Sequence, residues 1–504
     1  MYPPSIARGH PERPAYVMAG SGQRLSYGEL DAESNRLAQF WWHHGVRPGD
    51  AVVIVMENNI WWPVAVAAGM RSGVYVTPVN WHLAVPELAA LLAQAAPTAV
   101  VTSTGMAAVA VAALARGELK PTVISVDGPA PGCTDLATAV ADVSAEPLAD
   151  ELLGARVLFS GGTTGRPKRF VQPLLGVHPA QAPPRHSDLV HRLGIDENTV
   201  LLSPAPNYHA APFTFALITL AAGGTVVCME RFDAAAAMSA IVDYGVTHSQ
   251  WVPTMLIRLL RLPQRESIAL SPTHRAAFTS GAPCPPHVKT AIADWWGPIL
   301  HEYYGASEGY GHTYIAPEDV RAHSGSVGKP LGNTRIHIVD DEGVEVPVGE
   351  TGTVCFEAVK GGDSAATGPQ LKEMGDLGRV DEDGFLYLLG RAGYMIISGG
   401  VNIYPEEIEA ALSEHPAVAD AGVVGVPDPE FGENVKAVVE LRAGHHAEPA
   451  ELIEHCRGRI AGFKVPRIVE FTTDLPRLPT GKLDKAALHA RFAHPSARTH
   501  IPHQ

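Results

Sequence analysis

At 504 residues the chain exceeds the size at which a single hydrophobic core stops growing, so at least two domains are expected. Apolar residues make up 46% and charged residues 18% of the sequence, a globular balance that excludes a disordered chain. The 53 acidic and 38 basic side chains give a formal charge of -15, which repels nucleic acids and anionic lipids, so any phosphate group must be bound by local contacts.

The amino-terminal segment and the cysteines both favour a cytoplasmic protein. Residues Met1–Arg8 contain prolines but no apolar run, so no secretory signal is expected. The five cysteines are scattered, with no CxxC pair and no metal-ligand spacing, which suits a reducing compartment. The most apolar stretch, Ala95–Ala115, is broken by Thr102–Gly105, and this break predicts a buried strand followed by a helix rather than a membrane span.

Short β-branched runs alternate with Ala- and Leu-rich helical patterns through the first three quarters of the chain. Such alternation predicts parallel sheets covered by helices, and therefore an α/β fold. The predicted strands are Ala51–Met56, Thr98–Thr102, Val200–Ser203, Thr225–Met229 and His248–Val252, and the clearest predicted helices are Leu30–His44 and Pro86–Gln94.

From about Arg335 the texture changes to β segments separated by glycines. These segments are Thr334–Val339, Thr351–Phe356 and Gly384–Leu389, and they predict a distorted barrel or an antiparallel subdomain.

The last hundred or so residues have the pattern of a separate α+β module. Its predicted helices are Pro405–Ser413 and Pro449–Ile460, and its predicted strands lie near Val418–Val424 and Asn434–Leu441. A glycine-containing turn near Gly390–Gly393 marks the expected boundary, which divides the chain into residues 1–390 and 391–504.

The densest chemical signal is a loop of glycines and hydroxyl residues directly after the strand-like segment Arg156–Phe159. The loop reads Ser160-Gly161-Gly162-Thr163-Thr164-Gly165-Arg166-Pro167-Lys168. Its glycines permit positive φ and close approach, while successive N–H groups, three hydroxyls and one ammonium can surround phosphate oxygens. The loop lacks the Gly-Lys-Ser/Thr ending of a Walker P-loop. Taken alone, it fits a simple Gly/Thr-rich hairpin with a basic flank equally well.

Three further motifs follow this loop. The first is Tyr303-Tyr304-Gly305-Ala306-Ser307-Glu308-Gly309, the second runs from Gly375-Asp376 through Gly390-Arg391 to Gly399–Glu409, and the third is Leu478-Pro479-Thr480-Gly481-Lys482-Leu483-Asp484. Together with the loop, they resemble the adenylate-forming superfamily of acyl-CoA synthetases, peptide-synthetase adenylation domains and firefly-type luciferases. The order and separations are similar, so the resemblance extends over nearly the whole chain.

The resemblance implies a fold and a reaction. It implies a large AMP-binding domain at 1–390, with parallel-rich α/β sheets and a distorted β-barrel subdomain, and a small mobile α+β lid domain at 391–504. The implied enzyme is an acid-thiol ligase that activates a carboxylic acid as acyl-AMP, releases pyrophosphate and transfers the acyl group to coenzyme A. ATP, Mg²⁺ and coenzyme A are the implied cofactors. The Phe, Trp and Pro content of segments 209–215, 248–254 and 278–283 favours an apolar acid. The loop with Gly161, where many relatives have Ser, resembles that of bacterial acyl-CoA synthetases acting on bulky apolar acids, so the resemblance extends the expectation to a bulky acid. We expect a monomer or homodimer with no nucleic-acid partner and no membrane span.

The chemistry explains why charged residues are required. Joining a carboxylate to the α-phosphate of ATP brings two anions together, so catalysis depends on converging cations. Lys482 matches the family lysine that bridges the two groups, and Glu308, with Thr163, matches the residues that hold Mg²⁺. Asp376 matches the carboxylate that accepts the ribose hydroxyls, and Arg391 matches an arginine that reaches the ribose or the phosphates.

The resemblance also implies roles for less polar positions. Tyr304 would stack on adenine, and His209 would lie beside the acyl carboxylate. The remaining nucleotide-binding residues are expected to be Ser160, Gly161, Gly162, Thr163, Thr164, Gly165, Lys168, Gly281, Ala282, Pro283, Tyr303, Gly305 and Ser307. Without the resemblance, Tyr304 fits a core aromatic residue, His209 a structural histidine and Lys482 a solvated surface lysine.

Three glycines concern domain motion in the family. The hinge, near 390–394, usually has Asp or Lys at the position occupied here by Gly393, so rotation is feasible while a hinge-specific hydrogen bond is lost. Gly399 and Gly400 are expected to line the channel for the pantetheine arm of coenzyme A, although a simple turn before the following helix is compatible with the same residues.

Two alternatives stay open from the sequence. An adenylation enzyme that loads the phosphopantetheine of a carrier protein has the same motifs. A non-catalytic nucleotide-binding relative would be expected to lose its charged positions, but Lys168, Glu308, Asp376, Arg391 and Lys482 are all present.

Overall fold

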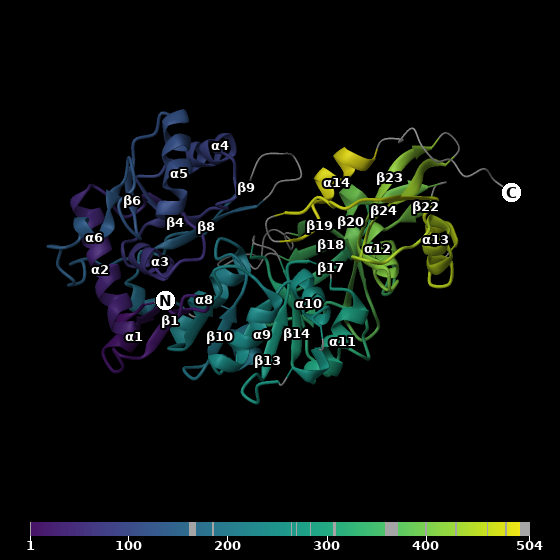
Figure 1. Cartoon of the computed structure of the whole chain (residues 1–504), viewed down its shortest axis with the longest axis horizontal. Coiled ribbons are helices and arrows are strands. Elements are labelled where there is room, and N and C mark those ends of the chain that lie inside the picture. The colour runs from purple at the N-terminus through teal and green to yellow at the C-terminus, as the bar shows by residue number, and fades with distance from the viewer. Residues whose placement is uncertain are drawn as a thin grey trace. The chain divides into compact units, whose positions relative to one another are not determined.

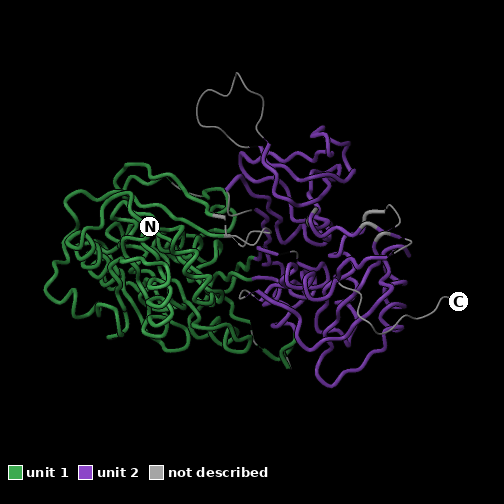
Figure 2. The backbone as a smooth tube through the Cα atoms, turned by 90° about the horizontal axis from the view of Figure 1, so that it is seen from above, with its two compact units in different colours: residues 1–251, 261–278 green, residues 252–260, 279–504 purple. Residues whose placement is uncertain are grey.

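The protein is described by a computed structural model, in which the chain forms two compact units (Figures 1 and 2). Unit 1 comprises residues 1–251 and 261–278, and unit 2 comprises residues 252–260 and 279–504. The predicted turn at 390–394 lies inside unit 2. The structure describes residues 2–160, 168–183, 186–263, 265–268, 270–282, 284–305, 309–357, 371–398, 401–428, 431–460, 462–478 and 481–493.

The first sheet of unit 1 is parallel except at one edge, and it is buried on both faces. Alternate residues of its central strand enter different cores: Val52 and Ile54 pack with helices α2 and α3, and Val53 and Val55 pack with α4 and α5. The strand order is β7-β6-β5-β3-β4-β8-β9, with β3 Ala51–Val55, β4 Tyr75–Pro78, β5 Ala99–Thr102, β6 Thr122–Ser125, β7 Thr134–Asp135, β8 Ala155–Ser160 and β9 Lys168–Val171. The helices are α2 Tyr27–His43, α3 Trp62–Arg71, α4 Val85–Ala95, α5 Thr104–Arg116 and α6 Leu136–Ala139.

A second run of strands in unit 1 is also mainly parallel. Strand β10 pairs in parallel with β11 and β12, β11 pairs in parallel with β1, and β2 is antiparallel to β1. The strands are β1 Pro14–Met18, β2 Arg24–Ser26, β10 Val200–Ser203, β11 Thr225–Cys228, β12 His248–Trp251 and β13 Ala276–Thr279. The accompanying helices are α1 Pro4–Ala7, η1 Pro179–Gln181, α7 Ser187–Leu193, α8 Ala210–Ala222, α9 Ala234–Asp243 and η2 Arg265–Ser267.

The antiparallel part predicted from about Arg335 lies in unit 2. Strands β17, β18, β19 and β20 form a sheet in that order, and each neighbouring pair is antiparallel. Their bounds are β17 Ile336–Val339, β18 Gly352–Glu357, β19 Leu371–Val380 and β20 Leu386–Arg391. The same unit contains α10 Pro253–Leu260, α11 Pro286–Trp296, β14 Leu300–Gly305, β15 His312–Ile315 and β16 Lys329–Pro330.

The carboxy-terminal module within unit 2 is a sheet with helices on both faces. Helices α12 and α13 pack with Val423, Val435 and Val439 on one side, whereas α14 packs with Val424 and Val438 on the other. The elements are η3 Ala392–Tyr394, β21 Ile396–Ser398, β22 Val401–Ile403, α12 Pro405–Ser413, β23 Val418–Asp428, β24 Gly432–Leu441, α13 Pro449–Arg457, η4 Gly462–Lys464, β25 Ile468–Phe471 and α14 Lys485–Phe492.

The predicted α/β fold is confirmed, and most differences concern the ends of elements. Helix α2 begins at Tyr27 instead of Leu30 because Ser26 and Glu29 form a reciprocal capping box. Strand β20 begins at Leu386, two residues after the predicted start at Gly384. The Gly384 N–H donates to the Asp381 carbonyl and closes a turn there. Strand β23 continues past Val424, since Val426 also packs against α14.

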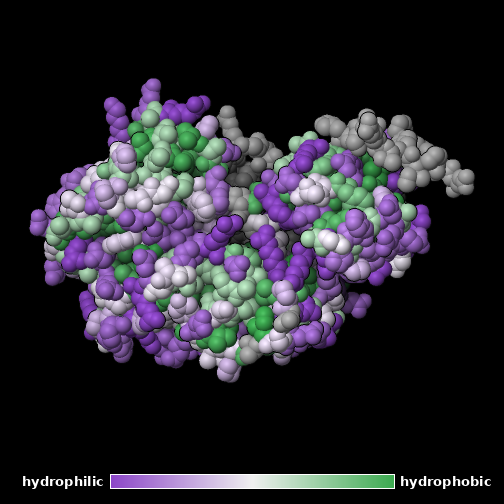
Figure 3. All heavy atoms as spheres, viewed as in Figure 1, coloured by the Kyte–Doolittle hydropathy of each residue, from purple (hydrophilic) through white to green (hydrophobic). Residues whose placement is uncertain are grey.

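Hydrophilic and hydrophobic residues are interspersed on the molecular face drawn in Figure 3. In the described ranges, no helix has both the length and the apolar character required to cross a bilayer.

Strand β12 carries a buried polar network in unit 1. The indole N–H of Trp251 donates to Ser249 Oγ at 2.6 Å, so the Ser249 hydroxyl is free to donate to His274 Nε2 at 2.7 Å. This arrangement requires a neutral imidazole. Burial, with a smaller contribution from His248, lowers the pKa of His274 from its usual 6.5 to about 4.

The network predicts a loss of stability in mild acid. His274 is protonated near pH 6.5 in the unfolded chain but only near pH 4 in the fold, so its contribution falls as the pH drops between these values. We expect the free energy of unfolding to fall by about 2 kcal/mol more between pH 7.5 and pH 5 in the wild type than in His274→Gln. Urea denaturation at both pH values measures the difference. The exposed His10→Gln should behave as the wild type, and an identical pH dependence in His274→Gln would contradict the expectation.

Candidate active site

Several predicted site residues lie outside the described part of the chain. The main-chain strand assignments of Ser160, Lys168 and Arg391 are described, but their side chains are not. The predicted residues outside the described ranges are Gly161, Gly162, Thr163, Thr164, Gly165, Pro283, Ser307, Glu308, Gly399 and Gly400. Their predicted roles, including the Mg²⁺ site at Glu308 and Thr163, stay predictions.

The strands on either side of the glycine-rich loop form a hairpin. Strand β8 pairs in parallel with β4, while its other edge is antiparallel to β9. Ser160 and Lys168 are partners in that register, so the two ends of the loop meet at the tip of the hairpin. Ser160 is the last residue of β8, so it lies at the carboxyl end of a strand paired in parallel with β4, the edge at which α/β sheets bind ligands.

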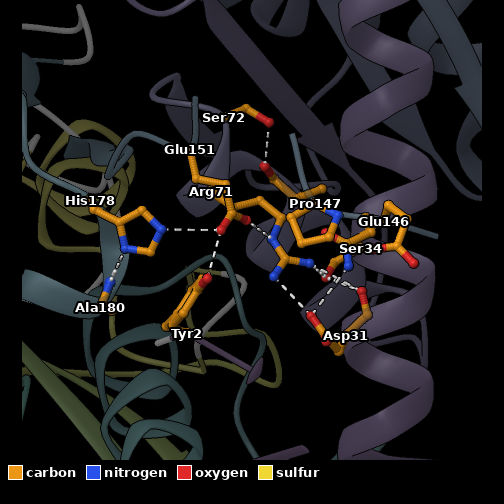
Figure 4. A network of polar contacts seen from close by, with 12 residues as sticks. Tyr2, Asp31, Ser34, Arg71, Ser72, Glu146, Pro147, Glu151, His178 and Ala180 are labelled. Carbon is orange, nitrogen blue, oxygen red and sulfur yellow. Dashed lines mark hydrogen bonds and ion pairs between the residues drawn. The ribbon is translucent and has the colours of Figure 1, made fainter. Parts of the chain in front are cut away.

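A buried ion network holds the base of this hairpin (Figure 4). Arg71, at the end of α3, contacts Glu151 Oε1 at 2.8 Å and Asp31 Oδ1 at 2.8 Å. The other Glu151 oxygen accepts from Tyr2 Oη at 2.6 Å and lies 3.4 Å from His178 Nε2. Glu151 precedes β8 and His178 follows β9, so one carboxylate connects both strands of the hairpin to the helical layer.

The segment that precedes His209 is held by Asn58, a residue that the sequence did not single out. The side-chain amide of Asn58 donates to the carbonyls of Ala205 and Met229 at 3.1 and 2.7 Å, and its oxygen accepts from the N–H of Asn207 at 2.8 Å. His209 is the N-cap residue of α8, and its ring lies 4.1 Å from the ring of Tyr208. Asn58 belongs to no recognisable motif, because its partners are backbone groups distant in sequence.

Tyr304 and Asp376 meet within unit 2. Tyr304, on β14, donates from its hydroxyl to Asp376 Oδ2, on β19, at 2.7 Å. Asp376 is also the register partner of Arg391 on β20, so two predicted nucleotide-binding positions are on adjacent strands of one sheet and the third, Tyr304, contacts them from a strand of another sheet through Asp376. Tyr304 was expected only as a stacking ring; its hydrogen bond to Asp376 is an additional contact.

A buried ion pair supports the strand that carries Tyr303, Tyr304 and Gly305. Lys289 Nζ, on α11, lies 2.6 Å from Glu302 Oε2 and donates to the carbonyl of Ser326 at 3.0 Å. Burial raises the pKa of Glu302, while Lys289 opposes the rise. The sequence analysis missed this pair, since Lys289 and Glu302 belong to no motif.

Lys482 reaches the segment Gly281-Ala282, also in unit 2. Its ammonium donates a hydrogen bond to the carbonyl oxygen of Gly281. The lysine sits on a tight turn in which Leu478 N–H donates to the Lys482 carbonyl at 2.8 Å and Gly481 N–H donates to the Leu478 carbonyl at 2.7 Å. Gly481 has a φ of +81°, a conformation that favours glycine. Lys482, Gly281 and Ala282 are thus brought together from positions two hundred residues apart in the sequence.

Gly393 lies in the short helix η3, and its conformation is not one that requires glycine. A Cβ added at Gly393 would meet no atom within 4 Å, and its φ is not positive. Its predicted role as a hinge is therefore not explained by crowding and stays a prediction.

Comparisons with known proteins agree with these motifs. The family model described as AMP-binding enzyme matches residues 5–361, and the model for the AMP-binding enzyme C-terminal domain matches residues 407–482. The chain is 29% identical to the long-chain-fatty-acid–CoA ligase FadD13 of Mycobacterium tuberculosis, over 96% of each protein. It is 34% identical to a feruloyl-CoA synthase of an Amycolatopsis species, over 95% of this chain and 96% of that protein.

A solved structure has the same fold. The crystal structure of ATP-bound MatB from Rhodopseudomonas palustris superposes with a TM-score of 0.82 at 27% identity, covering 98% of this chain and 99% of that one. The two family models together cover residues 5–482 except for 362–406, and they include the glycine-rich loop and Lys482. The chain therefore belongs to the family of AMP-binding, adenylate-forming enzymes.

Proposed function

We propose that this protein is an AMP-forming acid-thiol ligase that activates an apolar carboxylic acid with ATP and transfers the acyl group to coenzyme A. The observation that carries the proposal is the hydrogen bond from Lys482 to the Gly281 carbonyl, because it brings a cation to the segment expected beside the nucleotide. The ATP ligand of the MatB structure and the names of the two CoA-dependent relatives support the same reaction class.

In the first step a carboxylate oxygen attacks the α-phosphorus of ATP and pyrophosphate leaves. Both reactants are anions, so a positive charge at the point of contact lowers the barrier, most effectively in a site that excludes water. Lys482 supplies that charge, and Lys168 neutralises the phosphates near the hairpin tip. Oxygen donors at Glu308 and Thr163 suit Mg²⁺, which, when bound, would offset charge on the phosphates of ATP.

The nucleotide is oriented by the residues that converge in unit 2. Asp376 accepts hydrogen bonds from the ribose hydroxyls, and the Tyr304 hydroxyl keeps this carboxylate in place through the 2.7 Å contact. The Tyr304 ring stacks on adenine, with Gly281 and Ala282 on the other side of the base. Arg391 adds a positive charge to the same region.

In the second step a thiol sulfur attacks the acyl carbonyl and AMP leaves. Rotation of the module 391–504 about the hinge at 390–394 would withdraw Lys482 and bring Gly399-Gly400 to the site. Glycines leave space for a narrow pantetheine arm. His209, which follows the segment 205–207 bound by Asn58, is the residue that would contact the acyl carboxylate.

The acid is best sought among apolar substrates. One relative is named for long-chain fatty acids and the other for ferulate, and both acids carry a large apolar group. A carrier-protein thiol in place of coenzyme A is the competing acceptor.

Pyrophosphate release tests the proposed reaction. The purified protein is incubated with ATP, Mg²⁺ and a panel that includes dodecanoate, ferulate, indoleacetate and malonate, with and without coenzyme A. We expect acid-dependent pyrophosphate release and an acyl-CoA product for at least one apolar acid. Acyl transfer only to a phosphopantetheinylated carrier protein would overturn the proposed acceptor, and no acid-dependent pyrophosphate release with any member would argue against the activity.

Lys482→Ala should abolish most of the adenylation while leaving ATP binding largely intact. Removal of one preorganised donor to the transition state lowers the rate by about 100- to 1,000-fold. Acid-dependent ATP–pyrophosphate exchange measures the rate, and calorimetric titration measures ATP affinity. Lys120→Ala, at an exposed lysine in unit 1, is the matched control. Unchanged exchange in Lys482→Ala would exclude the proposed role.

Tyr304→Phe should raise the KM for ATP by about tenfold with little change in kcat, because the ring remains while the hydrogen bond to the Asp376 carboxylate is lost. Steady-state kinetics with varied ATP separates the two constants. Tyr387→Phe provides a matched control, since it removes a similar 3.0 Å hydrogen bond to Asp381 in the same unit. Equal effects of the two substitutions would indicate a general loss of stability instead of a nucleotide contact.

A further inference from the structure

The turn that carries Lys482 is held on both sides by ion pairs to the carboxy-terminal module. On one side Arg477 contacts Asp420 Oδ2 at 2.6 Å and donates to the carbonyl of Gly481 at 3.2 Å. On the other side Lys485, the first residue of α14, contacts Glu409 Oε1 at 2.5 Å. The backbone around Lys482 is therefore connected to β23 through Arg477 and to α12 through Lys485.

Lys485 lies between two carboxylates. Its Nζ is 3.5 Å from Glu406 Oε1 in addition to the Glu409 contact, and Glu409 Oε1 also accepts from the N–H of Val423 at 2.7 Å. The three charged side chains expose only 19% (Lys485), 19% (Glu406) and 16% (Glu409) of their surface, so water screens their interaction weakly. We name Glu406, Glu409 and Lys485 the EEK cluster.

The charges in the EEK cluster depend on one another. Burial raises the pKa of Glu409 to about 7; Lys485 opposes the rise and Glu406 adds to it. Burial alone would lower the pKa of Lys485, but the two carboxylates raise it, so the ammonium stays charged. Removing this single cation would leave two carboxylates close together in a largely buried site, which is costly.

Glu406 also connects the cluster to the strand that leads to the predicted hinge. Its Oε2 lies so close to the Cα of Gly390, at the end of β20, that a Cβ there would collide with it. Gly390 has a φ of +141°, so the position favours glycine on both steric and conformational grounds. The next residue is Arg391, whose register partner is Asp376. A continuous set of contacts thus runs from the turn of Lys482, through Lys485 and Glu406, to the strands expected to hold the ribose.

We propose that the EEK cluster is a positioning device for adenylation: Lys485, held by Glu409 and Glu406, keeps the turn of Lys482 in register with the Gly390-Arg391 end of β20. The inference rests on the proposed function, and Lys485 acts only through Lys482. Helix α14 has other supports, since Asp484 caps it through the N–H of Ala487 at 3.0 Å and Leu488 and Phe492 are buried in a hydrophobic cluster. Lys485 is therefore not needed merely to form the helix.

The two half-reactions distinguish positioning from general stability. Lys485→Met removes the charge and keeps an unbranched side chain only one atom shorter. We expect its kcat for acid-dependent ATP–pyrophosphate exchange to fall about 10- to 100-fold, up to the loss expected for Lys482→Ala. Because Lys482 is withdrawn for the second step, CoA thioester formation from supplied dodecanoyl- or feruloyl-adenylate should change less than threefold. Lys485→Arg, which preserves the charge, should restore exchange to within about threefold of the wild type.

Two further variants keep the test decisive. Glu406→Gln removes one carboxylate without changing side-chain size. It should lower the exchange rate by a smaller factor than Lys485→Met does, while leaving thioester formation unchanged. Lys464→Met removes an ion pair with Glu407, a residue of α12 that is outside the EEK cluster. This variant should leave both half-reactions unchanged. If Lys485→Met does not fold, as judged by circular dichroism, Glu406→Gln and Lys485→Arg still test the proposal.

The outcomes separate this inference from the proposed function. Equal losses in both half-reactions, or full exchange in a folded Lys485→Met protein, would overturn the positioning role. If Lys482→Ala retains exchange, the proposed role of that lysine is wrong. If Lys482→Ala loses exchange while Lys485→Met and Glu406→Gln retain it, only the EEK cluster proposal is wrong.

Discussion

Repulsion between two anions is the constraint on which the proposed chemistry depends. A carboxylate and a triphosphate approach each other only where cations are held at defined positions, because a mobile surface charge is screened by water and contributes little. Lys482 meets this requirement through geometry: a tight turn with one positive-φ glycine presents its ammonium to the Gly281 carbonyl. The net charge of -15 makes such local placement necessary, since the overall field of the protein repels the nucleotide.

Cations paired with carboxylates also support the other strands of the candidate site. Arg71 joins Asp31 and Glu151 at the base of the glycine-rich hairpin, and Lys289 is paired with Glu302 behind the strand of Tyr304. Lys485 joins two glutamates beside the turn of Lys482. Buried ion pairs add little net stability compared with apolar packing, but breaking one is costly, so each pair disfavours alternative positions of the strand or turn it supports.

Much of the fold was predictable because burial imposes local patterns. The strand Val200–Ser203 and the helix Pro405–Ser413 were anticipated from runs of apolar residues and their periodicity, and the predicted strand His248–Val252 ends one residue beyond the observed one. Element ends were less predictable where side chains decided them, as at the Ser26–Glu29 capping box. The family and the order of its motifs were also readable, since glycines, hydroxyl residues and charges at fixed spacings reflect the shape and charge of a nucleotide.

The sequence by itself determined the α/β class and the adenylate-forming family and predicted which residues bind ATP, because these depend on residue type and on spacing along the chain. Only the tertiary structure decided which of those residues meet and what supports them. The contacts Tyr304–Asp376 and Lys482–Gly281 join residues 72 and 201 positions apart, and the supports formed by Asn58, Lys289 and Lys485 use backbone carbonyls or distant carboxylates. Such partners produce no recognisable pattern in the sequence, because residues distant along the chain become neighbours only when the chain folds.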